Sequence, residues 1–345
     1  MKTKTITISE FGEFSLIDRL EEILPRAERS DLLVGIGDDC AVVKIEPDRA
    51  LLLTCDIQVQ DRHFRLENIS SYQLGRRALA VNLSDIAAMG GQPLYALVSL
   101  GLPPHYPLAD YEALFQGMRD ELKSYNALII GGNLAQTEKK LIIDITLIGE
   151  VHPDYYVERK GAREGDKIYI TGQVGASAAG FYILQKYGIK HSQEFQSLVE
   201  AHLQPRPRIE IGQKLAQKKL VSAMIDVSDG IASDLYHICR MSGVGAEIEL
   251  EAIPVPKQLQ NVAQVCQQAE KNLILHSGED YELLFTTRAE IQEAEIKDIG
   301  LEYGVPISCI GRIIPQSQGY LIIERDGLRN PLRPAGWDHF KSKTK

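Results

Sequence analysis

The chain has 345 residues, and because a single hydrophobic core usually stops growing below that length, we expect two domains. Its 44% hydrophobic and 25% charged residues are ordinary for a soluble globular protein, and no apolar run is long enough to cross a membrane. The formal net charge of -9 argues against a nucleic-acid partner, and the amino terminus lacks the apolar stretch of a secretory signal, so we expect a cytoplasmic protein.

In the first half of the chain, strand-like apolar segments alternate with helix-like ones, a pattern that favours a sheet with helices packed on it. The strand-like segments are 32–36, 40–45, 50–57, 94–104, 127–132 and 139–151, and the helix-like ones are 71–91 and 108–126. The first helix is expected to end at the glycine pair Gly90 and Gly91.

A passage between two domains is expected near residues 152–166, where proline, paired tyrosines and a Gly-rich stretch interrupt the pattern. We place the boundary at residue 150, which divides the chain into 1–150 and 151–345. Beyond it the mixture of helices and strands continues. Length and pattern together therefore predict two domains of mixed α/β structure.

Acidic residues stand at Gly-flanked turns or at the ends of apolar strands in both halves of the chain. They are Asp38, Asp39, Asp56, Asp85, Asp226, Asp229, Glu279 and Asp280. For any one of them a turn or helix N-cap is the simpler interpretation, because aspartate bonds to nearby backbone at those positions. As a set they would repel one another unless cations lay between them, and oxygen ligands of this kind select magnesium or calcium.

The common nucleotide-binding motifs are missing from the sequence. It has neither a G-x-x-x-x-G-K-[ST] phosphate loop nor a G-x-G-x-x-G fingerprint, and the acidic run DVSDGIASD does not have the spacing of a calcium-binding loop. A nucleotide bound by this chain would therefore be held chiefly through magnesium, with help from Gly-rich backbone such as residues 129–133 and from a few basic side chains.

A series of motifs runs along nearly the whole chain, from Phe11 to Phe340. The motifs are FGEFSLI, GIGDDCAVV, TCDIQVQDRHF, RALAVNLSDIAAMGGQP, LVSLGLP, LIIGGN, RKGAREGDKIYITG, IDVSDGIASDLYHI, SGEDYELLFT, CIGRI and GWDHF. This series resembles that of the bacterial thiamine-monophosphate kinases. The resemblance implies the two-domain α/β (α+β) fold shared with aminoimidazole ribonucleotide synthetase, in which the N-terminal sheet forms a homodimer interface and a C-terminal α/β domain follows.

The resemblance also implies an activity. The protein would phosphorylate thiamine monophosphate to thiamine diphosphate with ATP and several Mg²⁺ ions, by direct in-line transfer to an oxygen of the substrate phosphate. Because that phosphate is already largely a dianion at neutral pH, no general base is assigned. The alternatives are a diverged paralogue that acts on another phosphomonoester and a nucleotide-binding or thiamine-phosphate-binding protein with little turnover.

Position by position, the resemblance implies three groups of site residues. The magnesium ligands are Asp39, Thr54, Asp56, Asp85, Asp226 and Asp229, with Asp38 as an adjacent candidate and Cys55 and Asn133 at two further metal positions. The residues that hold ATP are Gly132, Asn133, Arg159 and Ser228, and those that hold thiamine monophosphate are His63, Glu279 and Trp337. A loop histidine, a packing tryptophan and a solvated linker arginine are the alternative interpretations of His63, Trp337 and Arg159.

Three places depart from the motifs of that family. Asn133 stands where the family usually has aspartate and Cys55 where it has threonine, so an amide and a thiol replace better magnesium ligands. Asp61 and Arg62 stand beside the substrate histidine, a position that bears on the choice of substrate. We expect these changes to loosen one metal site while nucleotide binding survives.

Overall fold

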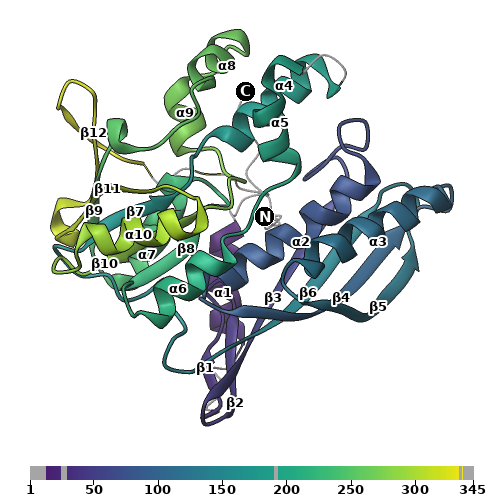
Figure 1. Cartoon of the computed structure of the whole chain (residues 1–345), viewed down its shortest axis with the longest axis horizontal. Helices are drawn as coiled ribbons and strands as arrows, with labels where there is room; N and C mark the ends of the chain where they lie inside the picture. Colours follow the sequence, from purple (N-terminus) through teal and green to yellow (C-terminus); the bar gives the residue numbers. More distant parts are fainter. Residues whose placement is uncertain (1–12, 25–28, 190–192, 334–335, 337–345) are drawn as a thin grey trace, which may run out of the picture.

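Two β-sheets, one in each half of the chain, organise the computed structural model (Figure 1). The structure describes residues 13–24, 29–189, 193–333 and 336. Strands of the first sheet lie before residue 152, and those of the second lie after residue 166. The short helix α1 (Glu13–Ile23) precedes the first sheet. This is the mixed α/β arrangement that the alternating sequence pattern predicts.

The first sheet has six strands in the order β1-β2-β3-β6-β4-β5. They are β1 (Leu32–Val34), β2 (Ala41–Glu46), β3 (Arg49–Val59), β4 (Gln92–Leu102), β5 (Leu128–Gln136) and β6 (Ile142–Val151). Strands β4 and β5 are parallel, because helix α3 (Leu108–Lys123) connects them and returns the chain to the same end of the sheet. Strand β5 runs beyond the expected strand over 127–132, since it pairs with β4 as far as Gln136.

Helix α2 (Ser71–Ala88) packs with α3 on one face of this sheet (Figure 1). It begins where Ser70 and Gln73 form a capping box, and the chain leaves it at Gly90, whose φ is +72°. The two helices approach closely because Gly117 of α3 carries no side chain. A Cβ there would come within 1.9 Å of the Tyr72 carbonyl oxygen. The expected helix over 71–91 is therefore confirmed, together with its end at the glycine pair.

The opposite side of the first sheet, which we call the open face, carries exposed apolar side chains. Because side chains alternate along a strand, those between the buried positions point away from the helices. Ile57, Tyr95, Leu97 and Ile130 are 37% to 55% exposed. An exposed apolar surface of this kind is typical of a protein–protein contact.

The second sheet has seven strands in the order β13-β12-β9-β11-β7-β10-β8. They are β7 (Lys167–Thr171), β8 (Ala223–Asp226), β9 (Gly245–Glu249), β10 (Leu283–Thr287), β11 (Ile307–Ile314), β12 (Tyr320–Ile323) and β13 (Arg329–Pro331). The α-helices of this half are α4 (Ala176–Tyr187), α5 (Gln196–Leu203), α6 (Ile209–Gln217), α7 (Ile231–Ser242), α8 (Leu259–Val265), α9 (Glu270–Leu275) and α10 (Glu293–Tyr303).

Helix α2 also joins the two halves of the chain. A Cβ on Gly212 of α6 would come within 2.1 Å of the Ala87 carbonyl oxygen, so the missing side chain lets α6 pack directly on α2. Strands β3 and β8, one from each sheet, both contact α2 as well. Side chains from both halves therefore meet along this helix. Within the described ranges, no helix has the length and apolar character needed to span a bilayer.

Candidate active site

Three carboxylates from distant parts of the chain meet beside α2. Asp39 lies between β1 and β2, Asp85 lies on α2, and Asp226 ends β8. One carboxylate oxygen of each lies within 4.8 Å of those of the other two. We call these three residues the acidic cluster. Like charges this close are stable only when protons, basic groups or cations reduce their repulsion.

The pKa values of these carboxylates show how unfavourable their charge is in the protein alone. Burial, followed by the charge of Asp39, raises the pKa of Asp226 to about 8. Burial and the charge of Asp56 raise the pKa of Asp85 well above its usual range. Oδ2 of Asp39 is buried and has no hydrogen-bond partner among the described residues. An orphaned acceptor among crowded carboxylates fits a hard divalent cation, which prefers oxygen ligands.

Strand alternation decides which side chains of β3 reach the acidic cluster. Oγ1 of Thr54 donates a hydrogen bond of 2.5 Å to Asp85 Oδ2. Asp56, two residues further, shares that side of the strand, and its charge acts on Asp85. Cys55 lies between them, so its side chain points to the open face, where Sγ lies 3.2 Å from Asp144 Oδ1. The structure thus brings Thr54 and Asp56 to the cluster and leaves the Cys55 thiol on the other side of the sheet.

The expected metal position Asn133 also lies away from the acidic cluster. It is on β5, at the edge of the first sheet, and pairs with Ser99 of β4. Because β6 and β4 separate β5 from β3, three strand spacings place Asn133 roughly 14 Å from β3. The neighbouring Gly132 has a φ of +151°, and a Cβ there would come within 1.8 Å of the Val98 carbonyl oxygen. Within one chain, the Asn133 side chain therefore does not join the acidic cluster.

Arg159, from the connecting segment 152–166, neutralises part of the acidic cluster. Its Nη2 donates to Asp39 Oδ1 at 2.7 Å, and its backbone N–H donates to Asp38 Oδ2 at 3.2 Å. Burial works to lower the pKa of Arg159, but the charge and hydrogen bond of Asp39, together with the charges of Asp38 and Asp226, outweigh it and raise that pKa. Burial and the charge of Asp39 raise the pKa of Asp38 to about 7. With its side chain only 18% exposed, Arg159 is not a solvated linker residue.

The turn after β8 carries Ser228 and Asp229 and is held by Asp234, a residue that sequence reasoning missed. Asp234 is buried in the first turn of α7, and its Oδ2 accepts hydrogen bonds from the N–H groups of Asp229 and Gly230 at 3.3 and 3.0 Å. Burial and the charge of Asp229 raise the pKa of Asp234 well above its usual range. The motif DVSDGIASD contained the signal, because its third aspartate, Asp234, follows the turn at the distance expected for an acidic residue in the first turn of a helix.

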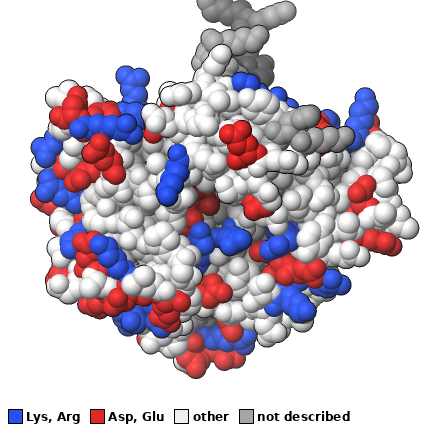
Figure 2. All heavy atoms as spheres, turned by 45° about the horizontal axis from the view of Figure 1, so that its top comes forward, with Lys and Arg blue, Asp and Glu red and all other residues white. Residues whose placement is uncertain are grey.

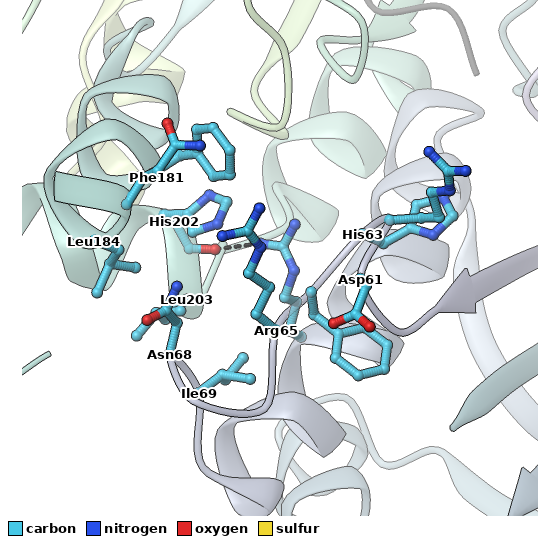
Figure 3. Close-up of a pocket in the computed structure, with 13 residues that line it drawn as sticks. Asp61, His63, Arg65, Asn68, Ile69, Phe181, Leu184, His202 and Leu203 are labelled. Carbon is cyan, nitrogen blue, oxygen red and sulfur yellow. Dashed lines mark hydrogen bonds between the residues drawn. The ribbon is translucent and has the colours of Figure 1, made fainter. Parts of the chain in front are cut away.

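A pocket of about 170 Å³ lies where the loop after β3 meets helices α4 and α5 (Figure 3). Its wall includes His63, Arg65, Arg77, Phe181, His202 and Leu203. Figure 3 shows His63 and Phe181 on opposite sides of it. Nδ1 of His63 accepts a hydrogen bond from the Val59 N–H at 2.9 Å, so a neutral ring carries its proton on Nε2. Asp61 and Arg62 also line this pocket, whereas Trp337 lies outside the described residues.

Glu279 stands next to the pocket and is held by Arg77, a second residue that sequence reasoning missed. Nη2 of Arg77 donates to Glu279 Oε1 at 2.5 Å, and Nη1 donates to the carbonyl oxygen of His202. Burial works to raise the pKa of Glu279, but the charge and hydrogen bond of Arg77, together with smaller contributions from His202 and His63, outweigh it and lower that pKa, so the carboxylate is ionised. Burial and the charge of Arg77 lower the pKa of His202 to about 4, which keeps its ring neutral.

Asp280, the acid that follows Glu279, serves the fold. Its carboxylate accepts hydrogen bonds from the N–H groups of Gly175 and Ser177 at 2.8 and 3.0 Å. These groups belong to the start of α4, so Asp280 supplies oxygen acceptors that the first turn of that helix otherwise lacks. Asp280 therefore caps a helix whose bonded residues lie 105 and 103 residues earlier in the chain, rather than forming the local turn or N-cap that its position in the sequence suggested.

Two features connect the pocket to the acidic cluster. Helix α2 carries Arg77 and Asp85, which are eight residues and hence about 12 Å apart along its axis. In addition, the N–H of Glu279 donates to the carbonyl oxygen of Ser228 at 2.8 Å, so the Glu279 segment lies against the turn after β8. Figure 2 shows acidic and basic side chains together in a hollow of one face of the molecule. Pocket and cluster are thus two parts of one site between the sheets.

Two family models match the chain. The model of the AIR synthase related protein, N-terminal domain, matches residues 37–151, and the model of the AIR synthase related protein, C-terminal domain, matches residues 163–324. Asp39 and Asp85 fall in the first match and Asp226 in the second, so the acidic cluster takes residues from both.

Known proteins are similar to the chain over nearly its whole length. The thiamine-monophosphate kinase of Escherichia coli (strain K12) is 39% identical over 331 residues, which are 95% of this chain and 98% of the relative. That of Bacillus subtilis (strain 168) is 34% identical over 327 residues, 94% of this chain and 99% of the relative. The solved structure of AaThiL complexed with AMPPCP and TMP has a TM-score of 0.84 and 31% identity, and the match covers 98% of this chain and 100% of that one.

Proposed function

The chain belongs to the thiamine-monophosphate kinase family, and from that premise we propose which of its residues carry out the reaction. The protein is an ATP-dependent kinase that converts thiamine monophosphate to thiamine diphosphate, with ADP as the second product. The observation that carries this function is the placement of a pocket and an acidic cluster at the two ends of one stretch of α2.

We assign the organic part of thiamine monophosphate to the pocket and its phosphate to the acidic cluster. Phe181 and Leu203 offer apolar contact to the rings, and ionised Glu279 next to the pocket suits a thiazolium cation. Arg77 and Asp85 lie about 12 Å apart along the axis of α2, and the substrate has to span this distance. His63 belongs to this substrate-binding group, and Trp337 stays a prediction.

We assign magnesium to Asp39, Asp85 and Asp226 of the acidic cluster, to Thr54 and Asp56 beside it on β3, and to Asp229 of the turn after β8, with Asp38 adjacent. The bound ions would neutralise the negative charge of the phosphates during transfer. The buried, unpartnered Oδ2 of Asp39 and the raised pKa values of Asp85 and Asp226 support this assignment, since both mark a shortage of positive charge. Cys55 and Asn133 stay predictions as metal positions.

The contribution of the protein's own residues is to bind the two phosphates and hold them in line. Arg159 is the basic side chain at the acidic cluster, and we assign it to the phosphates of ATP together with Ser228 of the adjoining turn. Gly132 and Asn133 stay predictions as ATP contacts. Because the acceptor phosphate is largely a dianion at neutral pH, no side chain has to remove a proton from it. Because α2 and the turn after β8 hold the two phosphates in position, they supply the rest of the rate enhancement.

We propose that two copies of the chain pair through the open face of the first sheet. The exposed side chains Ile57, Tyr95, Leu97 and Ile130 come from three strands and form an apolar surface opposite the helices. A symmetric dimer buries the same surface on both copies, so one patch satisfies both partners. The domain boundary at residue 150 and the cytoplasmic location stay predictions from the sequence.

The activity is tested with purified protein, ATP, Mg²⁺ and thiamine monophosphate. We expect the wild type to form ADP and thiamine diphosphate in equal amounts, measured by chromatography. The control Asp326→Asn, which removes an exposed carboxylate from the turn between β12 and β13, should form the same amounts. Asp226→Asn is expected to abolish both products. Nucleotide and thiamine monophosphate binding without product would instead favour a binding protein, the alternative raised by Asn133 and Cys55. Faster turnover of another phosphomonoester would favour a diverged paralogue.

A further inference from the structure

Arg77 is a buried cation in the wall of the pocket, and it belongs to neither the metal-binding nor the phosphate-binding residues. The residue is 1% exposed and is among the largest of the fully buried side chains. It lies on α2, yet both of its hydrogen bonds reach the other half of the chain. Nη2 binds Glu279 Oε1, and Nη1 binds the carbonyl oxygen of His202 at the end of α5, the contact drawn as a dashed line in Figure 3.

The backbone leaves Glu279 little freedom to move by itself. Its φ is +66°, in the left-handed region, and its N–H donates to the Ser228 carbonyl oxygen. Gly278 packs so closely that a Cβ on it would come within 1.8 Å of that same oxygen. With the backbone held in this way, the direction of the carboxylate depends on its side-chain partners.

Arg77 engages only one of the two carboxylate oxygens of Glu279. Oε1 accepts from the guanidinium at 2.5 Å, whereas Oε2 lies 3.6 Å from Nδ1 of His202 in the pocket wall. The Glu279 side chain is still 34% exposed, while that of Arg77 is 2% exposed. The guanidinium is therefore buried with Oε1 while part of the Glu279 side chain stays exposed, and we take Oε2 as the oxygen available to a ligand.

We propose that Arg77 is a positioning residue for the substrate that accepts the phosphoryl group. Arg77 binds Oε1 of Glu279 and so directs Oε2 at the cationic part of that substrate. The inference rests on the proposed function, because it takes thiamine monophosphate as that substrate. The substrate touches Glu279, and Arg77 acts through it. Since the same guanidinium also holds the end of α5, one side chain from the first half sets both the carboxylate and the adjoining wall of the pocket.

A purely structural ion pair would use similar contacts, and the preceding residue of α2 provides a matched example. Nε of Arg76 donates to Glu121 Oε2 of α3 at 2.8 Å, and Nη1 donates to Oε1 of Gln204, just after α5, at 3.3 Å. Like Arg77, it connects α2 to a carboxylate and to the end of α5. It does not line the pocket. Both arginines are expected to stabilise the fold, but only Arg77 is expected to affect the acceptor.

The test compares Arg77→Met, Arg77→Lys and the control Arg76→Met in the full chain. The readouts are the KM values for thiamine monophosphate and for ATP, kcat, the melting temperature, and the Kd for thiamine monophosphate by calorimetry without ATP. We expect Arg77→Met to raise the KM and Kd for thiamine monophosphate about tenfold or more and Arg77→Lys to raise them less, with the KM for ATP within about twofold of wild type. Arg76→Met lowers the melting temperature and leaves both thiamine monophosphate constants unchanged.

A double variant separates positioning from general stability. If Arg77 acts through Glu279, Arg77→Met combined with Glu279→Gln binds thiamine monophosphate no more weakly than Glu279→Gln alone. Additive losses, or equal effects of Arg76→Met and Arg77→Met on that Kd, would overturn the inference. If Arg77→Met does not fold, unchanged affinity in folded Arg77→Lys overturns it equally.

The same measurements keep the inference distinct from the proposed function. A wild type that binds thiamine monophosphate without turning it over refutes the function, and the comparison of Kd values still decides the role of Arg77. A wild type that does not bind thiamine monophosphate refutes both.

Discussion

Arg159 and Asp39 form a buried ion pair, with 2.7 Å between Nη2 of the arginine and Oδ1 of the aspartate. The aspartate side chain is fully buried, and its other oxygen has no hydrogen-bond partner within the described ranges. In the protein alone, the residue assigned to the ATP phosphates therefore compensates the charge of a residue assigned to magnesium. Before Mg·ATP binds, the residue expected to contact its phosphates and a residue expected to bind its metal therefore neutralise each other.

Removing Arg159 should destabilise the metal-free protein. Arg159→Met leaves Asp39 buried without its partner, and losing one partner of a buried pair costs about 3–5 kcal/mol of unfolding free energy. Because a cation can replace the guanidinium, added Mg²⁺ should restore part of the loss. Urea unfolding in a chelator and in Mg²⁺ measures both effects.

The control for that experiment is Arg312→Met. Arg312 also pairs with a carboxylate, Oε1 of Glu247 at 2.9 Å, but its side chain is 60% exposed. A pair of this kind contributes about 1 kcal/mol or less. An Arg159→Met variant that loses no more stability than this control would contradict a compensating role for Arg159.

Removing a carboxylate of the acidic cluster should separate stability from activity. Asp85→Asn keeps an oxygen for the hydrogen bond from Thr54 and removes a charge whose burial is unfavourable, so the metal-free protein should melt at a higher temperature. Turnover should fall about 100-fold or more, because a proposed magnesium ligand is lost. Melting curves in a chelator and kcat values test the two halves of this prediction. Normal turnover in this variant would remove Asp85 from the metal site.

His202 should make the protein less stable as the pH falls. Its folded pKa is about 4 against an ordinary value of 6.5, because burial and the charge of Arg77 oppose its protonation. Between these values the unfolded chain binds a proton that the folded chain does not, so this contribution to stability is complete above pH 6.5 and is lost on acidification.

The contribution of His202 is measured against a variant without it. His202→Asn keeps a polar group near Ser177 Oγ, which lies 3.0 Å from Nδ1 of the histidine. The unfolding free energy of wild type minus that of the variant should fall by about 2 kcal/mol between about pH 7.5 and about pH 5. A difference that stays constant over this range would mean that His202 titrates normally in the folded protein.

A charge on the open face should break the proposed dimer. Ile57 is 54% exposed in one chain, and Ile57→Lys would bury two lysines against apolar surface in a symmetric pair. We expect the wild type to sediment as a dimer and the variant as a monomer in analytical ultracentrifugation. Leu301→Lys is the control, since Leu301 is 79% exposed on α10 of the second half. Two variants with the same sedimentation as wild type would exclude the open face as the interface.

Much of the fold could be predicted because local patterns decide it. The apolar periodicity of 71–91 and the glycine pair at its end set the limits of α2, and the apolar run around Thr54 sets β3. The same alternation separates Thr54 from Cys55, which the motif alone had grouped as neighbouring metal positions. Alternation alone did not tell which of the two faces of the strand the helices cover, because that depends on the side of the sheet on which α2 packs.

The sequence by itself determined the elements, the family and the identity of the acidic residues, because these depend on short-range pattern and on motif order. Only the tertiary structure decided that Asp39, Asp85 and Asp226 meet while Asn133 stands three strands away from β3, since strand order and helix packing set those distances. It also decided the roles of Arg77 and Asp234. A buried charge is tolerated only where a partner stands opposite, and for Arg77 that partner, Glu279, comes from 202 residues further along the chain.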